Sequence, residues 1–501
     1  MLKKTGLWMM ALPLTLTLTF TLSACVSLPP PSSALPDIAV PAAWSSGMPA
    51  SGSAAAGDNT AGSAVGSTGL AQWWRRFDDP LLDALMAQAL QANTSVNGAQ
   101  AALLQARALR DVAAAGLLPG VAASGSAQRS KSGDASAANA FNAGFDASWE
   151  PDVFGANRSA LQAGEANAQA SAASLADVQV SIAAEVAVSY IQYRGAQARL
   201  AIARNNLDSQ LETLQITNWR VQAGLLTSLE GEQARAASEQ TRAQIPSLET
   251  SVAQLGHSLA LLCGQIPDAL RRQLSAVFPV PQAQDDLALS MPAETLRQRP
   301  DVRAAELQVS AALARVGQAD AARYPSFKLS GSLGLRALTL GSLGASGTLI
   351  SALLGSVAGP VFDAGAGLAQ VRAQQAALEQ VRLSYRATVL TALKDVEDAL
   401  VALGGDRERL LRLRNAADAA ANAALIARQR YASGLVDFQT VLETQRSLFG
   451  TQDAVATTST DLSADHVRLY KALGGGWQPD RDSAMPPVQL DSPNLTQPSN
   501  S

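Results

Sequence analysis

The chain carries one long pattern of residues twice at a nearly constant spacing, and this internal repeat constrains its fold more than any other feature. Residues 220–225 (RVQAGL) return as residues 430–435 (RYASGL), each within a stretch rich in Ala, Gln and Leu. A slightly shorter spacing carries Pro119 onto Pro325. A repeat of this size predicts a pseudo-symmetric architecture built from two similar halves.

Each copy of the motif predicts a tight turn between two helices, because Gly224 and Gly434 are of the residue type that ends a helix in a left-handed conformation. The flanking segments read as two very long helices and two shorter returning ones, at 157–222, 227–262, 367–433 and 437–473. At about 1.5 Å per residue, each long helix would span roughly 100 Å. Hairpins so thin, with mostly Ala on their apolar faces, cannot bury enough surface alone, which favours oligomerisation.

Shorter elements precede each long helix. First helices are expected at 94–115 and 300–323, and each is followed by a proline-marked break. Apolar and polar residues then alternate strictly over 141–150 and 327–336, and more weakly over 121–129 and 348–361. This period of two indicates strands with one apolar and one polar face, within about 119–150 and 325–361.

An apolar face backed by a polar face is typical of a transmembrane barrel, in which every backbone group pairs around a closed ring. Four strands cannot close such a ring. Three copies that supply about twelve strands could close it, since barrels of about eight or more strands are known. No apolar run after Leu22 approaches the roughly 20 residues of a membrane helix, so any membrane crossing is expected to use strands.

The beginning of the chain has the pattern of a secretory signal at residues 1–24, with two lysines before a short apolar run. The run ends in Leu22-Ser-Ala-Cys25, which resembles a bacterial lipobox, so Cys25 is the expected lipidation site and membrane anchor. An ordinary signal with an incidental cysteine is the alternative. Val26 and Ser27 imply, by analogy with lipoproteins that lack Asp at this position, sorting to the outer membrane.

The remaining organisation follows from composition. A Pro-, Ser-, Ala- and Gly-rich tether is expected over 25–70, one repeat over 71–298, the second over 299–479, and a disordered tail over 480–501. Only two cysteines exist, so Cys263 has no disulfide partner and reads as a small buried hydrophobe. No nucleophile elbow, metal motif or phosphate loop is present. We therefore expect no enzyme, no metal, no cofactor beyond the lipid on Cys25, and no nucleic acid partner.

Six short motifs, in one order from about residue 72 to residue 477, carry a resemblance to a known family. They are Trp73-Trp74 before FDDP at 77–80, WEPDVFG at 149–155, RPDVR at 299–303, GPVFDAG at 359–365, RYASG at 430–434 and LYKALGGGW at 469–477. Together they resemble the outer-membrane factor family, the TolC-like exit ducts of tripartite efflux pumps, and more narrowly its lipidated NodT-like branch.

The resemblance implies a mixed α+β membrane protein, in which a trimeric outer-membrane β-barrel with four strands per protomer continues into a long periplasmic α-helical barrel. Such a homotrimer would conduct small toxic compounds or drugs passively. A periplasmic adaptor (membrane fusion) protein would open it, an inner-membrane transporter would drive export, and outer membrane lipids would surround it. The alternatives are the outer-membrane channel of a polypeptide (type I) secretion system and a non-conducting coiled-coil envelope spacer. The two-faced strands argue against the spacer.

Residue by residue, the resemblance implies that the hairpin tips contact the adaptor through Arg220, Gly224, Leu225, Arg430, Gly434 and Leu435. The simpler alternative is a turn in which Gly serves geometry alone. The implied periplasmic gate comprises Tyr431, Gln439 and Glu443.

Tyr431 matches a tyrosine of the family's closed gate, and Glu443 falls where the family usually places an Asp that faces the pore constriction. Gln439 stands where related ducts often have a Leu, and a solvated helix face is the alternative for Glu443. A ring of like carboxylates would raise some of their pKa values and attract cations. The first copy has Val221 and Gln233 at the positions of Tyr431 and Glu443, so the second hairpin is expected to move when the duct opens.

Overall fold

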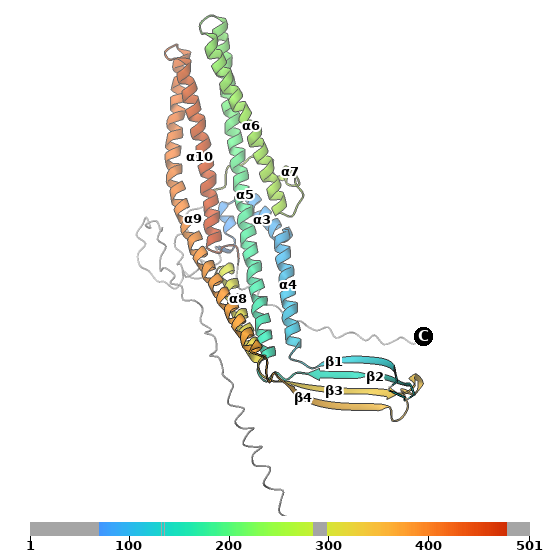
Figure 1. Ribbon diagram of the computed structural model, residues 1–501. Coiled ribbons are helices and arrows are strands. Elements are labelled where there is room, and N and C mark those ends of the chain that lie inside the picture. Colours follow the sequence, from blue (N-terminus) through green and yellow to red (C-terminus); the bar gives the residue numbers. More distant parts are fainter. Residues whose placement is uncertain (1–69, 132, 135, 284–297, 478–501) are drawn as a thin grey trace, which may run out of the picture. The chain divides into compact units, whose positions relative to one another are not determined.

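The computed structural model describes residues 70–131, 133–134, 136–283 and 298–477, and helices dominate this part of the chain (Figure 1). The signal segment, Cys25, most of the tether and the tail lie outside the described residues. After a 3₁₀ turn, η2 (Trp73–Phe77), the first repeat comprises α3 (Pro80–Ala92), α4 (Thr94–Ala115), β1 (Gly120–Ser130), β2 (Ala138–Trp149), α5 (Ala156–Gln222), α6 (Ser228–Leu262) and α7 (Arg271–Leu274). The second repeat comprises α8 (Pro300–Ala321), β3 (Ser326–Ala337), a 3₁₀ turn η5 (Leu340–Ser342), β4 (Leu349–Ala358), α9 (Ala366–Ala432) and α10 (Phe438–Ala472).

The order of elements is the same in both repeats, as the internal repeat predicts: a first helix, a strand hairpin, a long helix and a returning helix. The two long helices have 67 residues each, and the two returning helices have 35 each. The predicted helices and strands are all present, with bounds shifted by only a few residues. Each long helix therefore runs from the end of a strand hairpin to a helical hairpin tip.

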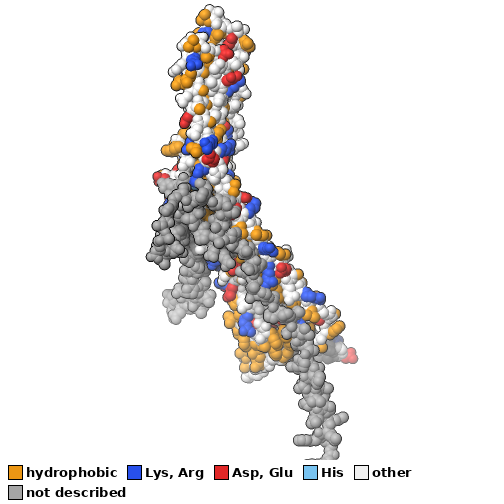
Figure 2. Space-filling model, turned by 90° about the vertical axis from the view of Figure 1, so that its left-hand side faces the viewer, with side chains coloured by type: hydrophobic (Ala, Val, Ile, Leu, Met, Phe, Trp, Pro, Cys, Tyr) orange, Lys and Arg blue, Asp and Glu red, His pale blue; other side chains and the backbone are white. Residues whose placement is uncertain are grey.

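The four strands form one antiparallel sheet in the order β1-β2-β3-β4, so strands of the two repeats pair at its centre. The register places Phe145 opposite Leu333, and both belong to the apolar face that alternation predicts. Polar side chains share the other face, where Ser124 donates a hydrogen bond to Asp146 at 2.6 Å. The two outer strands, β1 and β4, have a partner on one side only within the described residues. Figure 2 shows hydrophobic side chains gathered at the lower end of the visible face.

The largest apolar core lies where η2 and α3 meet the long helix α5 and the returning helix α10, so it joins the two repeats. Trp73 is completely buried there and stacks on Tyr470 with ring centroids 5.4 Å apart. Asp79 caps α3, because its carboxylate accepts the backbone N–H groups of Leu81 and Leu82. The hydroxyl group of Tyr190 on α5 donates a hydrogen bond to the same carboxylate at 2.7 Å. The helix cap thus also fixes α3 to α5.

One glycine allows two helices to pack closely beside this core. A Cβ atom on Gly195 of α5 would lie 2.3 Å from Oγ1 of Thr460 on α10, so only glycine fits where these helices approach. Cys263 is buried, as predicted, and burial raises the pKa of its thiol to about 11.

One expectation about membrane helices needs correction. By length and composition, α5 contains an 18-residue window apolar enough to cross a membrane, whereas no apolar run of about 20 residues was expected after Leu22. Half of that window is buried inside the fold. A core helix meets the same criteria, because a helix that packs on several sides is apolar all round. The burial of Tyr190 and Ile191 on α5 agrees with a core position.

Candidate functional site

The two hairpin tips have the same backbone geometry. Gly224 and Gly434 adopt φ angles of +73° and +72°, in the left-handed region that favours glycine. The backbone N–H of Leu225 donates to the carbonyl oxygen of Arg220 at 2.8 Å, and Leu435 donates to Arg430 at 2.9 Å. This is the Schellman pattern of helix termination, which confirms both predicted turns. It accounts for the glycines by geometry alone.

The leucines after these glycines contribute their backbone N–H groups to the turn, whereas their side chains make no part of it. Leu225 and Leu435 are 72% and 74% exposed, although large apolar side chains are costly to leave in water. The returning helices begin three residues later, at Ser228 and Phe438. Thr227 caps α6 by accepting the N–H of Leu229, and Asp437 caps α10 by accepting that of Thr440. Each tip therefore exposes a leucine side chain directly after its glycine.

Arg220 joins the first tip to the second. Its two terminal nitrogens donate to the backbone carbonyl oxygens of Tyr431 and Ala432, at 3.1 Å and 3.2 Å. These are carbonyls in the last turn of α9, where the helix dipole favours a cation. The guanidinium also lies 4.5 Å from the centroid of the Tyr431 ring, in a cation–π contact. Arg220 is thus engaged within the chain.

Tyr431 is buried at the contact between the hairpins, with 7% of its surface exposed. Its ring lies 5.7 Å from that of Phe438 and belongs to a small apolar cluster. The other buried members of this cluster come from both hairpins: Ala234, Ala237, Ala427, Val441 and Leu442. The Tyr431 hydroxyl is buried without a hydrogen-bond partner among the described residues, which is a costly arrangement.

Gln439 and Glu443 lie on the opposite face of α10 and are both exposed. They are one helical turn apart, and the Gln439 amide donates to the Glu443 carboxylate at 3.4 Å. The structure therefore brings these two predicted gate residues together on α10, whereas Tyr431 lies in the last turn of α9 and is buried between the hairpins. Arg430 is exposed, with no hydrogen bond or ion pair within the described ranges, in contrast to Arg220.

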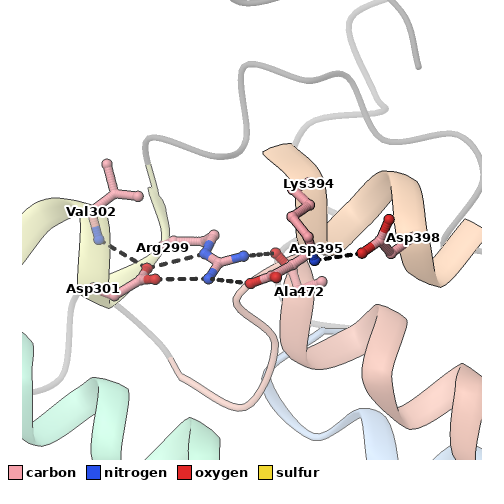
Figure 3. A network of polar contacts seen from close by, with 7 residues as sticks. All are labelled: Arg299, Asp301, Val302, Lys394, Asp395, Asp398 and Ala472. Carbon is pink, nitrogen blue, oxygen red and sulfur yellow. Dashed lines mark hydrogen bonds and ion pairs between the residues drawn. The ribbon is translucent and has the colours of Figure 1, made fainter. Parts of the chain in front are cut away.

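A second polar site ties the first helix of the second repeat to its returning helix (Figure 3). Arg299, just before α8, pairs with Asp301 through two nitrogens, at 3.0 Å and 2.7 Å. Its third nitrogen donates to the carbonyl oxygen of Ala472 at the end of α10, at 2.7 Å. Asp395 of α9 completes the site with an ion pair at 3.6 Å. One buried guanidinium therefore holds α8, α9 and α10 together.

The first repeat makes the equivalent contact with a neutral residue. The Asn93 amide, at the start of α4, donates to the carbonyl oxygen of Leu262 at the end of α6, at 2.8 Å. Both repeats thus dock a first helix on a returning helix in the same way, and only the second uses charge. Burial and the nearby Asp301 raise the pKa of Asp177 on α5, while Arg299 opposes that rise.

A further buried arginine was not predicted from the sequence. Arg194 of α5 is completely buried, with its guanidinium 5.0 Å from the Tyr190 ring and 5.2 Å from the Phe278 ring. It donates to the carbonyl oxygen of Ala276 at 2.5 Å and so holds the segment after α7 against α5. The available signal was a Tyr four residues before this arginine within an apolar stretch. Among the described residues, no group of three or more His, Cys, Asp and Glu side chains is placed to hold a metal ion.

Comparisons with known proteins agree with this architecture. The family model described as outer membrane efflux protein matches residues 85–265 and 291–475. The chain is 33% identical over 426 residues to the pyoverdine export outer membrane protein OpmQ of Pseudomonas aeruginosa, covering 82% of this chain and 88% of that protein. It is 31% identical over 415 residues to Nodulation protein T of Rhizobium leguminosarum bv. viciae, covering 82% and 86%. The solved outer-membrane channel OprN superimposes with a TM-score of 0.78 at 35% identity, over 82% of this chain and 93% of that one.

Proposed function

This chain belongs to the outer membrane efflux protein family, and from this premise we propose that it is the outer-membrane exit duct of a tripartite efflux system. It is an outer membrane protein whose relatives are channels rather than enzymes. In the proposed assembly, three copies form a passive duct, Cys25 carries the lipid anchor, and energy comes from an inner-membrane transporter reached through a periplasmic adaptor.

The observation that carries the proposal is the sheet and its connection to the helices. Four strands expose an apolar face that includes Phe145 and Leu333, and β1 and β4 each have an open edge within the described residues. An exposed edge is normally a liability, because its backbone groups can pair with another chain. Three copies would pair β4 of one with β1 of the next and close a ring of about twelve strands. The apolar face would then meet lipid, and α5 and α9 would continue the duct.

The exposed tip leucines support contact with the adaptor. Leu225 and Leu435 are exposed in the turns at those ends of the long helices that lie away from the sheet, where a periplasmic partner would meet the duct. Arg430 is exposed beside Leu435, whereas Arg220 already bonds to the second hairpin. We therefore assign the adaptor contact mainly to the leucines, and assign Arg220 to holding the two tips together.

The proposed gate is the stretch of α10 after the second tip. Gln439 and Glu443 share the exposed face of α10, so three copies around an axis could present rings of amides and carboxylates to the pore. Tyr431 would contribute from the buried side, by fixing the second hairpin against the first. The relative named for pyoverdine export favours a small molecule over a polypeptide as cargo.

Export from cells tests this proposal. In the native host with the gene deleted, a toxic dye such as ethidium should accumulate, and the parent gene should restore its export. The double variant Leu225→Asp, Leu435→Asp should assemble normally yet fail to restore export, because a charge replaces each apolar contact. Leu261→Asp is a matched control, since this leucine is also exposed but lies far from the tips. Full export by the double variant would refute the proposed adaptor contact at the leucines. If deletion of the gene leaves dye accumulation unchanged, the proposed efflux function is wrong.

A further inference from the structure

Contacts between the two repeats recur at both ends of the long helices, and each leaves a counterpart residue unused. At the tips, Arg220 of the first repeat donates to the carbonyl oxygens of Tyr431 and Ala432 of the second. The counterpart of Arg220 is Arg430, which is exposed and without a polar partner in the part of the chain that the structure describes. The same spacing makes Gln222, at the end of α5, the counterpart of Ala432.

The same situation exists where the strands lead into the long helices. Phe154, before α5, stacks on Tyr324 of the second repeat with ring centroids 4.8 Å apart and planes inclined by 18°. Each long helix is preceded by a proline that a Val-Phe pair follows, and the second pair ends in Phe362, which is 90% exposed. The counterpart of Tyr324 is Leu118, at the end of the first helix of the first repeat, and it is 68% exposed.

One symmetry operation relates these observations. A rotation superimposes the first repeat on the second within one chain. In a ring of copies, the same rotation applied again superimposes the second repeat on the first repeat of the neighbouring copy. A head-to-tail interface of this kind closes into a ring when its rotation divides a full turn. In that ring, every in-chain contact between the repeats has an equivalent between neighbouring copies wherever the side chains permit it.

We infer that Arg430 donates hydrogen bonds to the last carbonyl groups of α5 in a second copy of this chain, and that Phe362 packs on Leu118 of that same copy. The inference rests on the oligomeric duct of the proposed function and names the side chains that join its subunits. The carbonyls at the end of α5 carry the negative end of the helix dipole, which suits a guanidinium. Packing Phe362 on Leu118 removes two exposed apolar side chains from water.

The tip contact between copies differs from its in-chain equivalent in one respect. Tyr431 provides an aromatic ring beneath Arg220, whereas Val221 occupies the corresponding position beneath Arg430. The contact between copies therefore lacks a cation–π interaction and the buried cluster around Tyr431. It is the weaker of the two contacts, so the ring of tips has alternating strong and weak joints.

Pairs of introduced cysteines test both contacts in the full-length protein in detergent. The double variants Arg430→Cys, Gln222→Cys and Phe362→Cys, Leu118→Cys should each give covalent dimers and trimers with a short bis-maleimide on a denaturing gel. The matched controls are the in-chain equivalents Arg220→Cys, Ala432→Cys and Phe154→Cys, Tyr324→Cys, which should cross-link without an increase in mass. The buried native Cys263 should contribute little, and the single-cysteine variants measure that background.

The outcomes separate this inference from the proposed function. The mass of each complex is measured before cross-linking. A three-chain complex whose Arg430–Gln222 and Phe362–Leu118 pairs give no product above one chain would overturn the inference and leave the duct standing. A complex of one chain for the parent would overturn the duct itself. Covalent trimers from both pairs would establish the subunit contacts.

Discussion

Replacing Arg299 with methionine should loosen the joint between α8, α9 and α10, because Asp301 and Asp395 then lose the guanidinium that pairs with them. The Arg299 side chain is 10% exposed, and it pairs with Asp301 through two hydrogen bonds and with Asp395 at 3.6 Å. Removing one partner of a buried ion pair costs about 3–5 kcal/mol. We expect about 3 kcal/mol, the lower end, because the Asp395 side chain is 41% exposed and solvent screens its charge.

Hydrogen exchange measures this loss locally, without requiring reversible unfolding of the whole complex. At about 1.4 kcal/mol per tenfold change, amides in the last turn of α10 and the first turn of α8 should exchange about 100-fold faster in Arg299→Met. Arg303→Met is the matched control. This exposed arginine of α8 makes a long cation–π contact, with its guanidinium 6.0 Å from the centroid of the Trp477 ring. Its loss should therefore cost less than about 1 kcal/mol. Exchange in Arg299→Met within about twofold of the parent would refute the reasoning.

The defect should also depend on pH. Burial and Asp301 raise the pKa of Asp177, and Arg299 opposes that rise, so the pKa rises further when Arg299 is removed. A carboxyl group with a raised pKa binds its proton more readily in the folded state, so folded-state stability falls as pH rises through that pKa. The exchange difference between Arg299→Met and the parent should therefore shrink from about pH 7 to about pH 5. A difference that grows on acidification would contradict this assignment.

Three further predictions address packing, thiol reactivity and the gate. Gly195→Ala places a methyl group 2.3 Å from Thr460 and should lower the free energy of unfolding of the complex by about 1–3 kcal/mol. The control Gly405→Ala meets nothing within 4 Å and should raise it by up to about 1 kcal/mol. Equal melting curves for the two variants would contradict the close α5–α10 contact. Cys263, with a pKa of about 11 instead of 9.0, should react with maleimide about 100-fold more slowly than an ordinary thiol until the chain is unfolded, and rapid labelling of the native protein would refute its burial. Glu443→Ala should lower the preference of the pore for cations, which the reversal potential in a salt gradient measures. An unchanged reversal potential would show that Glu443 does not line the pore.

The helices and strands were predictable because their signals are local. The glycines at 224 and 434 end helices through their own backbone freedom, and the alternation from Phe327 to Arg336 fixes both the strand and its two faces. The internal repeat then supplied the order of elements twice. Only the bounds moved by a few residues, since helix and strand ends depend on capping partners that the pattern does not show.

The polar contacts were not predictable, because each joins residues far apart in the chain. Arg220 and Arg430 are alike in sequence, yet among the residues that the structure describes only Arg220 bonds to carbonyl groups. The cluster from both hairpins that buries the Tyr431 ring was equally invisible in the sequence, and the role of Tyr431 at a gate stays a prediction. Arg299 belongs to one of the motifs shared with the family, but the sequence suggests no role for it. Its role follows from its contacts with Ala472 and Asp395, which lie far from it in the sequence.

The most direct test of the account is single-channel recording from the purified full-length protein in a planar lipid bilayer, using the fraction whose mass corresponds to three chains. A closed ring of strands that leads into a helical tube predicts discrete conductance steps of uniform size and a preference for cations. A three-chain complex that inserts into the bilayer and conducts no ions would contradict the central claim that this chain forms a duct.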